Sequence, residues 1–411
     1  MASLATFATG AWPAQHGIVA ERWYDPDSRS LVSASEELLS AETLAAGVAA
    51  DSRSRVTVIG HERAHAALFA GTPDARLYWL DELGRFASNG ETQDWLAAFN
   101  AQKTSESARN ARWMALGAKP DAAPLRTLTY TAERANDYLL LWRSSPFSMA
   151  AQFDLLNELL ARENPGKGPG LDVYCLLAGS MEQLGYETGG RSPLMEQMAL
   201  HADRRIEGLL AQLARTAGEN GFTLAVAGAH GAPAEPRSEA RERMTVHGEQ
   251  VAQAAGRGLP EGASIEKYVY PFLYLKTGSR DAEAVRVAAA RAAMRHPAVG
   301  GYYTAGGSCP APAEWAQRFR NSFHATRSGD VMLSYRPGYI ESFGEDRGVS
   351  YGSLYNYDAV VPVCFYGPQF RAAQHEEEID AVDFAPTLAR AAGVALPSSA
   401  TGRVRAEAFA E

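Results

Sequence analysis

The sequence predicts an α/β protein whose central, mostly parallel β-sheet is flanked by helices on both faces. Two observations lead to this prediction: several short apolar runs have the length of strands, and longer stretches with helical periodicity separate them along the chain. The runs lack a regular alternation of polar and apolar residues, which is typical of strands covered on both faces. A chain of 411 residues, 46% of them hydrophobic and 21% charged, is long and apolar enough for a large globular core.

Four apolar runs are the expected strands, and each is bounded by glycine, proline or charged residues. They are residues 55–60 (RVTVIG), 171–178 (LDVYCLLA), 222–228 (FTLAVAG) and 360–367 (VVPVCFYG). We expect both faces of these strands to be covered by helices.

Two stretches have helical periodicity. In residues 194–217 apolar side chains recur every three or four positions, which predicts one amphipathic helix. They are Leu194, Met198, Ala202, Ile206, Leu209 and Leu213. Residues 380–392 predict a second helix, with Val382, Leu388 and Ala389 on its inner face.

The expected core comprises residues 1–265 and 330–411. Residues 266–329 have a strand, helix and strand pattern of their own, which predicts a cap or subdomain inserted in the core. Stretches rich in glycine and proline at 164–170 and 256–262 indicate surface connections.

Composition excludes several classes of function. A net charge of -9 argues against nucleic-acid binding, which needs a basic face. No run of 18 apolar residues predicts a membrane span. Cys175, Cys309 and Cys364 have neither the number nor the spacing of a disulfide framework or a zinc ribbon. The chain as given starts without a signal peptide, which predicts a cytoplasmic protein.

Four segments together resemble the alkaline phosphatase superfamily, in its branch of type I phosphodiesterases, nucleotide pyrophosphatases and phosphate-irrepressible alkaline phosphatases. Residues 5–25 (ATFATGAWPAQHGIVAERWYD) are similar to the segment that follows the nucleophile. Residues 322–338, 351–367 and 379–397 are similar to later family segments in the same order. Many members of this family are periplasmic or secreted. The resemblance implies an alkaline phosphatase-like fold that lacks the family's first strand, and we expect this loss to leave unpaired backbone groups inside the sheet.

The resemblance also implies a site for two metal ions, usually zinc, with a Thr or Ser nucleophile between them. Two cations activate such a nucleophile and offset charge on the reacting oxygens. The nucleophile position would precede Met1, so the sequence contains no candidate catalytic residue. Glu182 and His230 remain as candidate metal ligands, and each would belong to a different ion. At three further ligand positions this chain has Tyr186, Ala229 and Tyr351, which are poor ligands or none.

Candidate substrate-binding residues follow from the same resemblance. The family's Lys-x-Arg corresponds to residues 61–63, so Arg63 keeps a forked donor for an anionic oxygen and His61 replaces the lysine. A family asparagine corresponds to Glu21, whose charge repels phosphate. The loss of metal ligands and the gain of a carboxylate both disfavour phosphoryl transfer.

Each candidate also has a purely structural interpretation. His230 is expected to cap a loop, Tyr351 to pack or donate a hydrogen bond, and Glu182 and Tyr186 to fill a vacated pocket together. Arg63 is expected to pair with Glu62 or Glu21 if it binds no ligand.

Residues 61–65 match the H-E-x-x-H motif of zinc proteases, which needs both histidines on one face of a helix. Here the motif follows an expected strand directly, and no third ligand follows at a known spacing. The metalloprotease interpretation therefore lacks its structural context.

The sequence thus predicts a degenerate superfamily member with little or no metal-dependent hydrolysis of phosphate esters, binding zinc weakly or not at all. Two alternatives remain open. One is a phosphatase or phosphodiesterase whose nucleophile strand lies outside this chain, and the other is a protein that binds a small anionic or phosphorylated ligand without chemistry.

Overall fold

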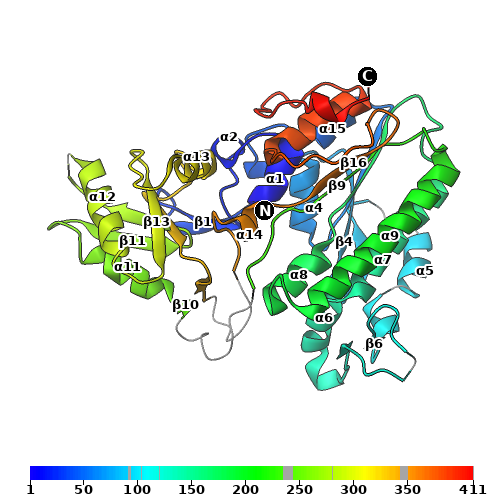
Figure 1. Cartoon of the computed structure of the whole chain (residues 1–411), viewed down its shortest axis with the longest axis horizontal. Coiled ribbons are helices and arrows are strands. Elements are labelled where there is room, and N and C mark those ends of the chain that lie inside the picture. The colour runs from blue at the N-terminus through cyan, green and yellow to red at the C-terminus, as the bar shows by residue number, and fades with distance from the viewer. Residues whose placement is uncertain are drawn as a thin grey trace.

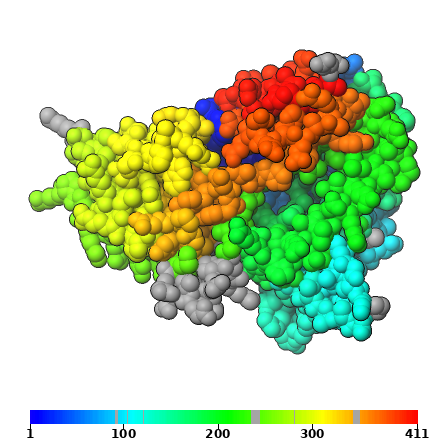
Figure 2. All heavy atoms as spheres, in the orientation of Figure 1, coloured from blue at the N-terminus to red at the C-terminus, as the bar shows by residue number. Residues whose placement is uncertain are grey.

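A computed structural model describes residues 1–90, 94–102, 104–119, 121–234, 244–279, 281–342 and 350–410. Figure 1 shows two lobes. The larger contains the long helices and the N- and C-terminal segments, and the smaller contains residues coloured yellow-green to yellow. In Figure 2 the orange residues lie across the middle of the visible face, between the yellow of the smaller lobe and the green of the larger.

The larger lobe contains a four-stranded sheet in the order β5-β4-β3-β8. The strands are β5 (Phe86–Ser88), β4 (Arg76–Leu80), β3 (Arg55–Ile59) and β8 (Asp172–Leu176). β3 lies between β4 and β8 and is parallel to both, and β5 is antiparallel to β4. The predicted strands at 55–60 and 171–178 are confirmed.

The other two predicted strands form a separate antiparallel pair, β9 (Leu224–Ala227) with β16 (Val363–Tyr366). Within the part of the chain that the structure describes, β8 pairs only with β3 and β9 only with β16. The expected central sheet is therefore divided in two. Side chains of β8 and β9 are half-buried or exposed, not covered as predicted.

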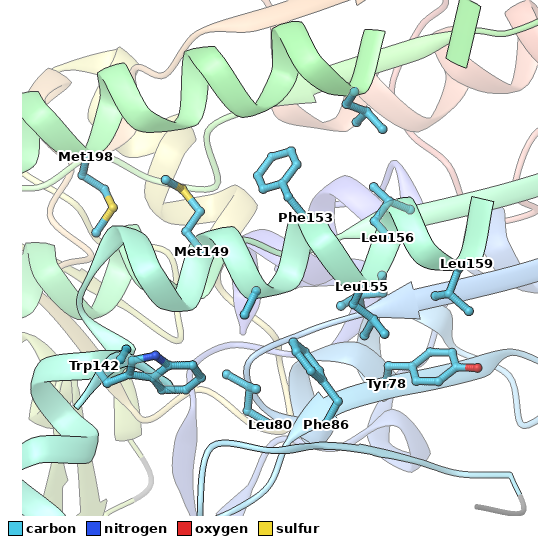
Figure 3. Close-up of a cluster of buried hydrophobic side chains, with 14 of the residues drawn as sticks. Tyr78, Leu80, Phe86, Trp142, Met149, Phe153, Leu155, Leu156, Leu159 and Met198 are labelled. Atoms are coloured by element: carbon cyan, nitrogen blue, oxygen red, sulfur yellow. The ribbon is translucent and has the colours of Figure 1, made fainter. Parts of the chain in front are cut away.

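Two long helices cover one face of the sheet: α7 (Pro146–Glu163) and α9 (Pro193–Ala217), the helix predicted at 194–217. The Ser192 side chain accepts a hydrogen bond from the Met195 backbone N–H and caps α9. Figure 3 shows side chains of α7 pointing toward β4 and β5. Fully buried members of this cluster include Met149, Leu155 and Trp142.

The remaining helices of the larger lobe pack around these strands. Their bounds are α1 (Ala2–Thr9), α2 (Pro13–His16), α3 (Leu44–Ala49), α4 (Arg63–Ala70), α5 (Asp94–Asn100), α6 (Ala135–Arg143), α8 (Gly179–Thr188), α14 (Asn356–Ala359) and α15 (Phe384–Ala392). The helix predicted at 380–392 appears as a short 3-10 turn followed by α15. Two small antiparallel pairs complete this lobe, β1 (Arg22–Asp25) with β2 (Ser30–Ser33) and β6 (Arg112–Trp113) with β7 (Arg126–Thr127).

The smaller lobe is built on an antiparallel sheet in the order β11-β12-β14-β13. Its strands are β11 (Ser264–Val269), β12 (Phe272–Lys276), β14 (Val331–Tyr335) and β13 (Val299–Thr304). Helices α12 (Ala282–Ala293) and α13 (Ala313–Ser322) come from the same segment. The sheet extends beyond both ends of the predicted cap at 266–329, and the division into domains stays a prediction.

A short parallel pair lies beside this sheet, formed by β10 (Thr245–Val246) and β15 (Ile340–Glu341). Helix α11 (Gly248–Gly256) follows β10 and packs on β11. None of the helices that the structure describes is long and apolar enough to span a membrane. All three cysteines are free thiols.

Candidate functional site

The candidate metal ligands Glu182 and His230 lie close together, each in a segment that follows a strand. Glu182 lies in the first turn of α8, directly after β8, and His230 follows β9. In Figure 1 these elements and α14 lie near the centre of the view, close to the end marked N. The His230 Nε2 atom is 3.6 Å from Glu182 Oε1. The prediction that the two residues would belong to different metal ions stays a prediction.

The pKa shifts of Glu182 and His230 both favour the charged form of the side chain. Burial alone raises the pKa of Glu182, but the hydrogen bond with His230 and its positive charge lower it overall. Burial alone lowers the pKa of His230, but the contacts with Glu182 and the Gly231 carbonyl raise it overall. Each side chain therefore stabilises the charged form of the other, and a metal ion at His230 Nε2 would have to displace a proton.

Aromatic rings fill the space around this pair. The ring of Tyr351 lies 4.2 Å from the ring of Tyr186 and 4.3 Å from the imidazole of His230, centroid to centroid. The Tyr351 hydroxyl donates to the Glu182 backbone carbonyl at 2.8 Å. A Cβ at Gly185 would come within 2.6 Å of that hydroxyl, so this glycine leaves room for Tyr351. The expectation that Tyr351 packs or donates a hydrogen bond is confirmed.

Two details of the sequence analysis are corrected. Tyr186 was expected to fill the pocket with Glu182, but its ring packs on Tyr351, and Glu182 pairs with His230. Sequence reasoning also missed Asp358, a buried carboxyl in α14. Its Oδ2 accepts the Ser353 backbone N–H at 2.9 Å, and its Oδ1 has no hydrogen-bond partner within the described chain. Burial raises the pKa of Asp358, and the nearby charge of His230 opposes this.

These residues do not fit a two-zinc site. Zinc in a structural or catalytic site takes at least three nitrogen, sulfur or carboxylate ligands from the protein. Among the described residues no three His, Cys, Asp or Glu side chains lie close enough together to hold one ion. The side chain of Ala229 has no donor atom, and Tyr186 and Tyr351, at the other two positions that the resemblance matches to ligands, pack their rings on each other.

A second imidazole and carboxylate lie beside this pair. His65 Nε2 is 3.9 Å from Glu21 Oε1, and this contact lowers the pKa of Glu21. The carboxylate that the resemblance places against phosphate is thus near a histidine that sequence reasoning considered only as part of the H-E-x-x-H motif. His65 lies in α4, one turn from the residues matched to the family's Lys-x-Arg, and that proximity was the available signal.

His61 is turned into the protein. It is 2% exposed, and its Nε2 lies 3.0 Å from Ser148 Oγ and 3.1 Å from Ser180 Oγ. Because α4 begins at Arg63, His61 precedes the helix and does not share a helical face with His65. The structure therefore lacks the geometry of an H-E-x-x-H zinc site. A substrate-binding role for His61 stays a prediction, although its ring is buried in this structure.

Arg63 lies at the surface. Its side chain is 56% exposed, 3.7 Å from Glu36 and over the ring of Trp79. The expected partners are otherwise engaged, since Glu62 pairs with Arg143 and Glu21 faces His65. An anion-binding role for Arg63 stays a prediction.

The class of protein is evident from comparison of the whole fold. The crystal structure of wild-type alkaline phosphatase PafA matches it with a TM-score of 0.83 and 19% identity, over 100% of this chain and 89% of that chain. Murine ectonucleotide pyrophosphatase / phosphodiesterase 5 matches with a TM-score of 0.52 and 15% identity, over 96% of this chain and 83% of that chain. The fold is therefore alkaline phosphatase-like, as predicted.

The sequence gives the family. The model for type I phosphodiesterase / nucleotide pyrophosphatase matches residues 1–350, and the chain belongs to that family within the alkaline phosphatase superfamily. Alkaline phosphatase PhoV of Synechococcus elongatus is 21% identical over 96% of this chain and 81% of its own length. Alkaline phosphatase PafA of Elizabethkingia meningoseptica is 21% identical over 96% and 83%.

The ring packing predicts a structural role for Tyr351. Tyr351→Ala removes both ring contacts and the hydrogen bond, and we expect it to lower the free energy of unfolding by about 2–3 kcal/mol. Tyr351→Phe removes only the hydroxyl, and we expect a loss of about 1 kcal/mol. Urea unfolding of both variants checks the difference. Equal losses would show that the ring contributes little.

Proposed function

We propose that this chain has little or no metal-dependent hydrolysis of phosphate esters, although it retains the fold of such enzymes. The proposal is supported by one observation above all: the two remaining candidate ligands, Glu182 and His230, face each other at 3.6 Å, and among the described residues no group of three possible ligands surrounds them. In a two-metal mechanism both cations must remain bound to stabilise the attacking and leaving oxygens. A site without three converging ligands is not expected to hold either cation.

The expected result is less than one zinc ion bound per chain and no enzyme-like turnover. Purified protein, dialysed against zinc and then washed, is assayed for bound metal and for hydrolysis of p-nitrophenyl phosphate and bis-p-nitrophenyl phosphate. Alkaline phosphatase PafA, treated in the same way, is the positive control. Two tightly bound zinc ions with turnover that depends on them would refute the proposal and favour the hydrolase alternative.

We also propose, separately, that Arg63 binds a small anionic ligand. Its support is the exposed guanidinium, which lies over the ring of Trp79 and 3.7 Å from Glu36. Inorganic phosphate, sulfate and AMP at millimolar concentration are expected to raise the Tm of the wild-type chain and not of Arg63→Gln. An unchanged Tm, or an equal rise in the variant, contradicts this proposal.

A further inference from the structure

Three side-chain oxygens meet at the base of the smaller lobe. The hydroxyl oxygens of Tyr268 in β11 and Tyr335 in β14 are 2.5 Å apart. Glu341 Oε2 in β15 is 3.0 Å from the first and 2.6 Å from the second. All three pairs are within hydrogen-bond distance, so the oxygens form a closed triangle.

The number of protons decides whether this triangle is stable. Two tyrosine hydroxyls supply two protons, so an ionised carboxylate would leave one of the three edges as a contact between lone pairs. A protonated carboxyl supplies the third proton, and each oxygen then donates once and accepts once around the ring. At 2.5–3.0 Å an edge without a proton is repulsive.

We propose that Glu341 is protonated in the folded protein near neutral pH, and that the triangle is a pH-sensitive latch between β15 and the sheet of the smaller lobe. Loss of the carboxyl proton places an uncompensated negative charge in a buried position and breaks one hydrogen bond of the ring. The latch therefore weakens as pH rises.

The surroundings of Glu341 support a neutral carboxyl. The residue is 9% exposed, and burial raises its pKa to about 7, although the hydrogen bonds from the two tyrosines oppose this. No charged side chain is among the groups that shift this pKa. Burial also raises the pKa of Tyr268 and of Tyr335, so both keep their protons.

Two other titratable groups are close. Tyr270, which packs on Tyr335 with ring centroids 4.9 Å apart, has a pKa raised by burial and by the Glu341 charge. On the side of α11, Gly248 approaches Glu341 Oε1 and is preceded by His247. Tyr270 thus stays protonated, and the described surroundings supply no cation that pairs with a Glu341 carboxylate.

The position of the triangle gives the latch its mechanical role. β15 carries the chain out of the smaller lobe and pairs with β10, which carries it in. The Ser342 N–H donates to the Val246 carbonyl, and the Ser350 hydroxyl accepts the Glu341 N–H. The triangle links β15, and through it the β10–β15 pair, to β11 and β14. Loss of the triangle therefore weakens the attachment of this pair to the sheet of the smaller lobe.

Replacement of the titrating group tests the latch. Glu341→Gln donates two N–H bonds at any pH and allows one tyrosine to donate to the other, so the triangle stays closed. For the wild type, the folded-state pKa near 7 exceeds the ordinary value of 4.5. The stabilisation by the protonated Glu341 carboxyl is therefore complete below about pH 4.5. It is lost as the pH rises to about 7, and this loss increases the unfolding equilibrium constant by about 300-fold. We expect the pH profiles of wild type and Glu341→Gln to diverge by roughly this factor, and parallel profiles would overturn the proposal.

A second measurement needs no variant. In protein labelled with 13C at the glutamate side-chain carboxyl, we expect a resonance that titrates near pH 7, and we expect it to be absent from Glu341→Gln. If every glutamate titrates below pH 5.5, the carboxyl is ionised in the folded state and the proposal fails.

Discussion

Acidification from pH 7 to pH 5 is expected to cost the folded chain about 4 kcal/mol through two buried histidines alone. His16 and His61 are 0% and 2% exposed, and burial lowers the pKa of each to about 3. In the unfolded chain both titrate near 6.5. Below that pH the unfolded state binds more protons than the folded state, so stability falls as pH falls, down to about pH 3.

The hydrogen bonds of these residues explain why the charged form is disfavoured. His16 Nδ1 accepts the Ile18 backbone N–H, so its Nε2 carries the single proton and faces the Thr6 hydroxyl. A second proton on Nδ1 would break that acceptor contact. His61 has one nitrogen against two buried hydroxyls and the other without a partner in the described chain. Among the described residues, neither ring has a hydrogen bond or ion pair with an acidic side chain that would stabilise an imidazolium.

Urea unfolding at pH 7, 6 and 5 measures this cost. His61→Gln removes one titrating group, and we expect the loss between pH 7 and 5 to shrink by about 2 kcal/mol, whatever the variant's stability at pH 7. His375→Gln is the matched control, because His375 is exposed and its removal should leave the profile unchanged. If His61→Gln and wild type have the same pH profile, His61 is protonated at its ordinary pKa and is not buried in solution.

Asp383→Ala is expected to lower the free energy of unfolding by about 3 kcal/mol, because it removes the buried partner of the Arg405 guanidinium and leaves a 3.5 Å contact with the half-exposed Glu407. Asp383 and Arg405 are 3% and 8% exposed. Arg405 Nε and Nη2 both donate to Asp383 Oδ2, the former at 2.7 Å. Asp383 Oδ1 also accepts the Arg403 backbone N–H at 2.8 Å. One carboxylate therefore holds the C-terminal segment against the start of α15.

The double variant Asp383→Leu with Arg405→Met separates two effects on stability: the cost of leaving one buried charge unpaired, and the net contribution of the ion pair. Because it removes both charges, we expect it to be at least 2 kcal/mol more stable than Asp383→Ala. Arg134→Met, which breaks the exposed pair with Asp137, is the control and should cost less than 1 kcal/mol. A cost of Asp383→Ala similar to this control would show that solvent reaches Arg405.

Local sequence patterns were sufficient to predict four strands, two helices and the family. Residues 55–60 and 194–217 form β3 and α9 because an apolar run between breakers and a three-to-four-residue repeat each favour one backbone conformation. Order along the chain was sufficient for the superfamily, since the matching segments occur in sequence. The residue types at three positions that the resemblance matches to ligands, Tyr186, Ala229 and Tyr351, also led to the prediction of a degenerate site, which stays a prediction.

Only the tertiary structure decided which side chains meet. Glu182 and His230 are 48 positions apart in numbering, and their contact depends on how β8 and β9 are placed. The same is true of the edges of β8 and β9, of the burial of His61 and of the triangle around Glu341. Pairing, burial and protonation depend on distances between distant segments and on the exclusion of water, and neither quantity is contained in a local pattern of residues.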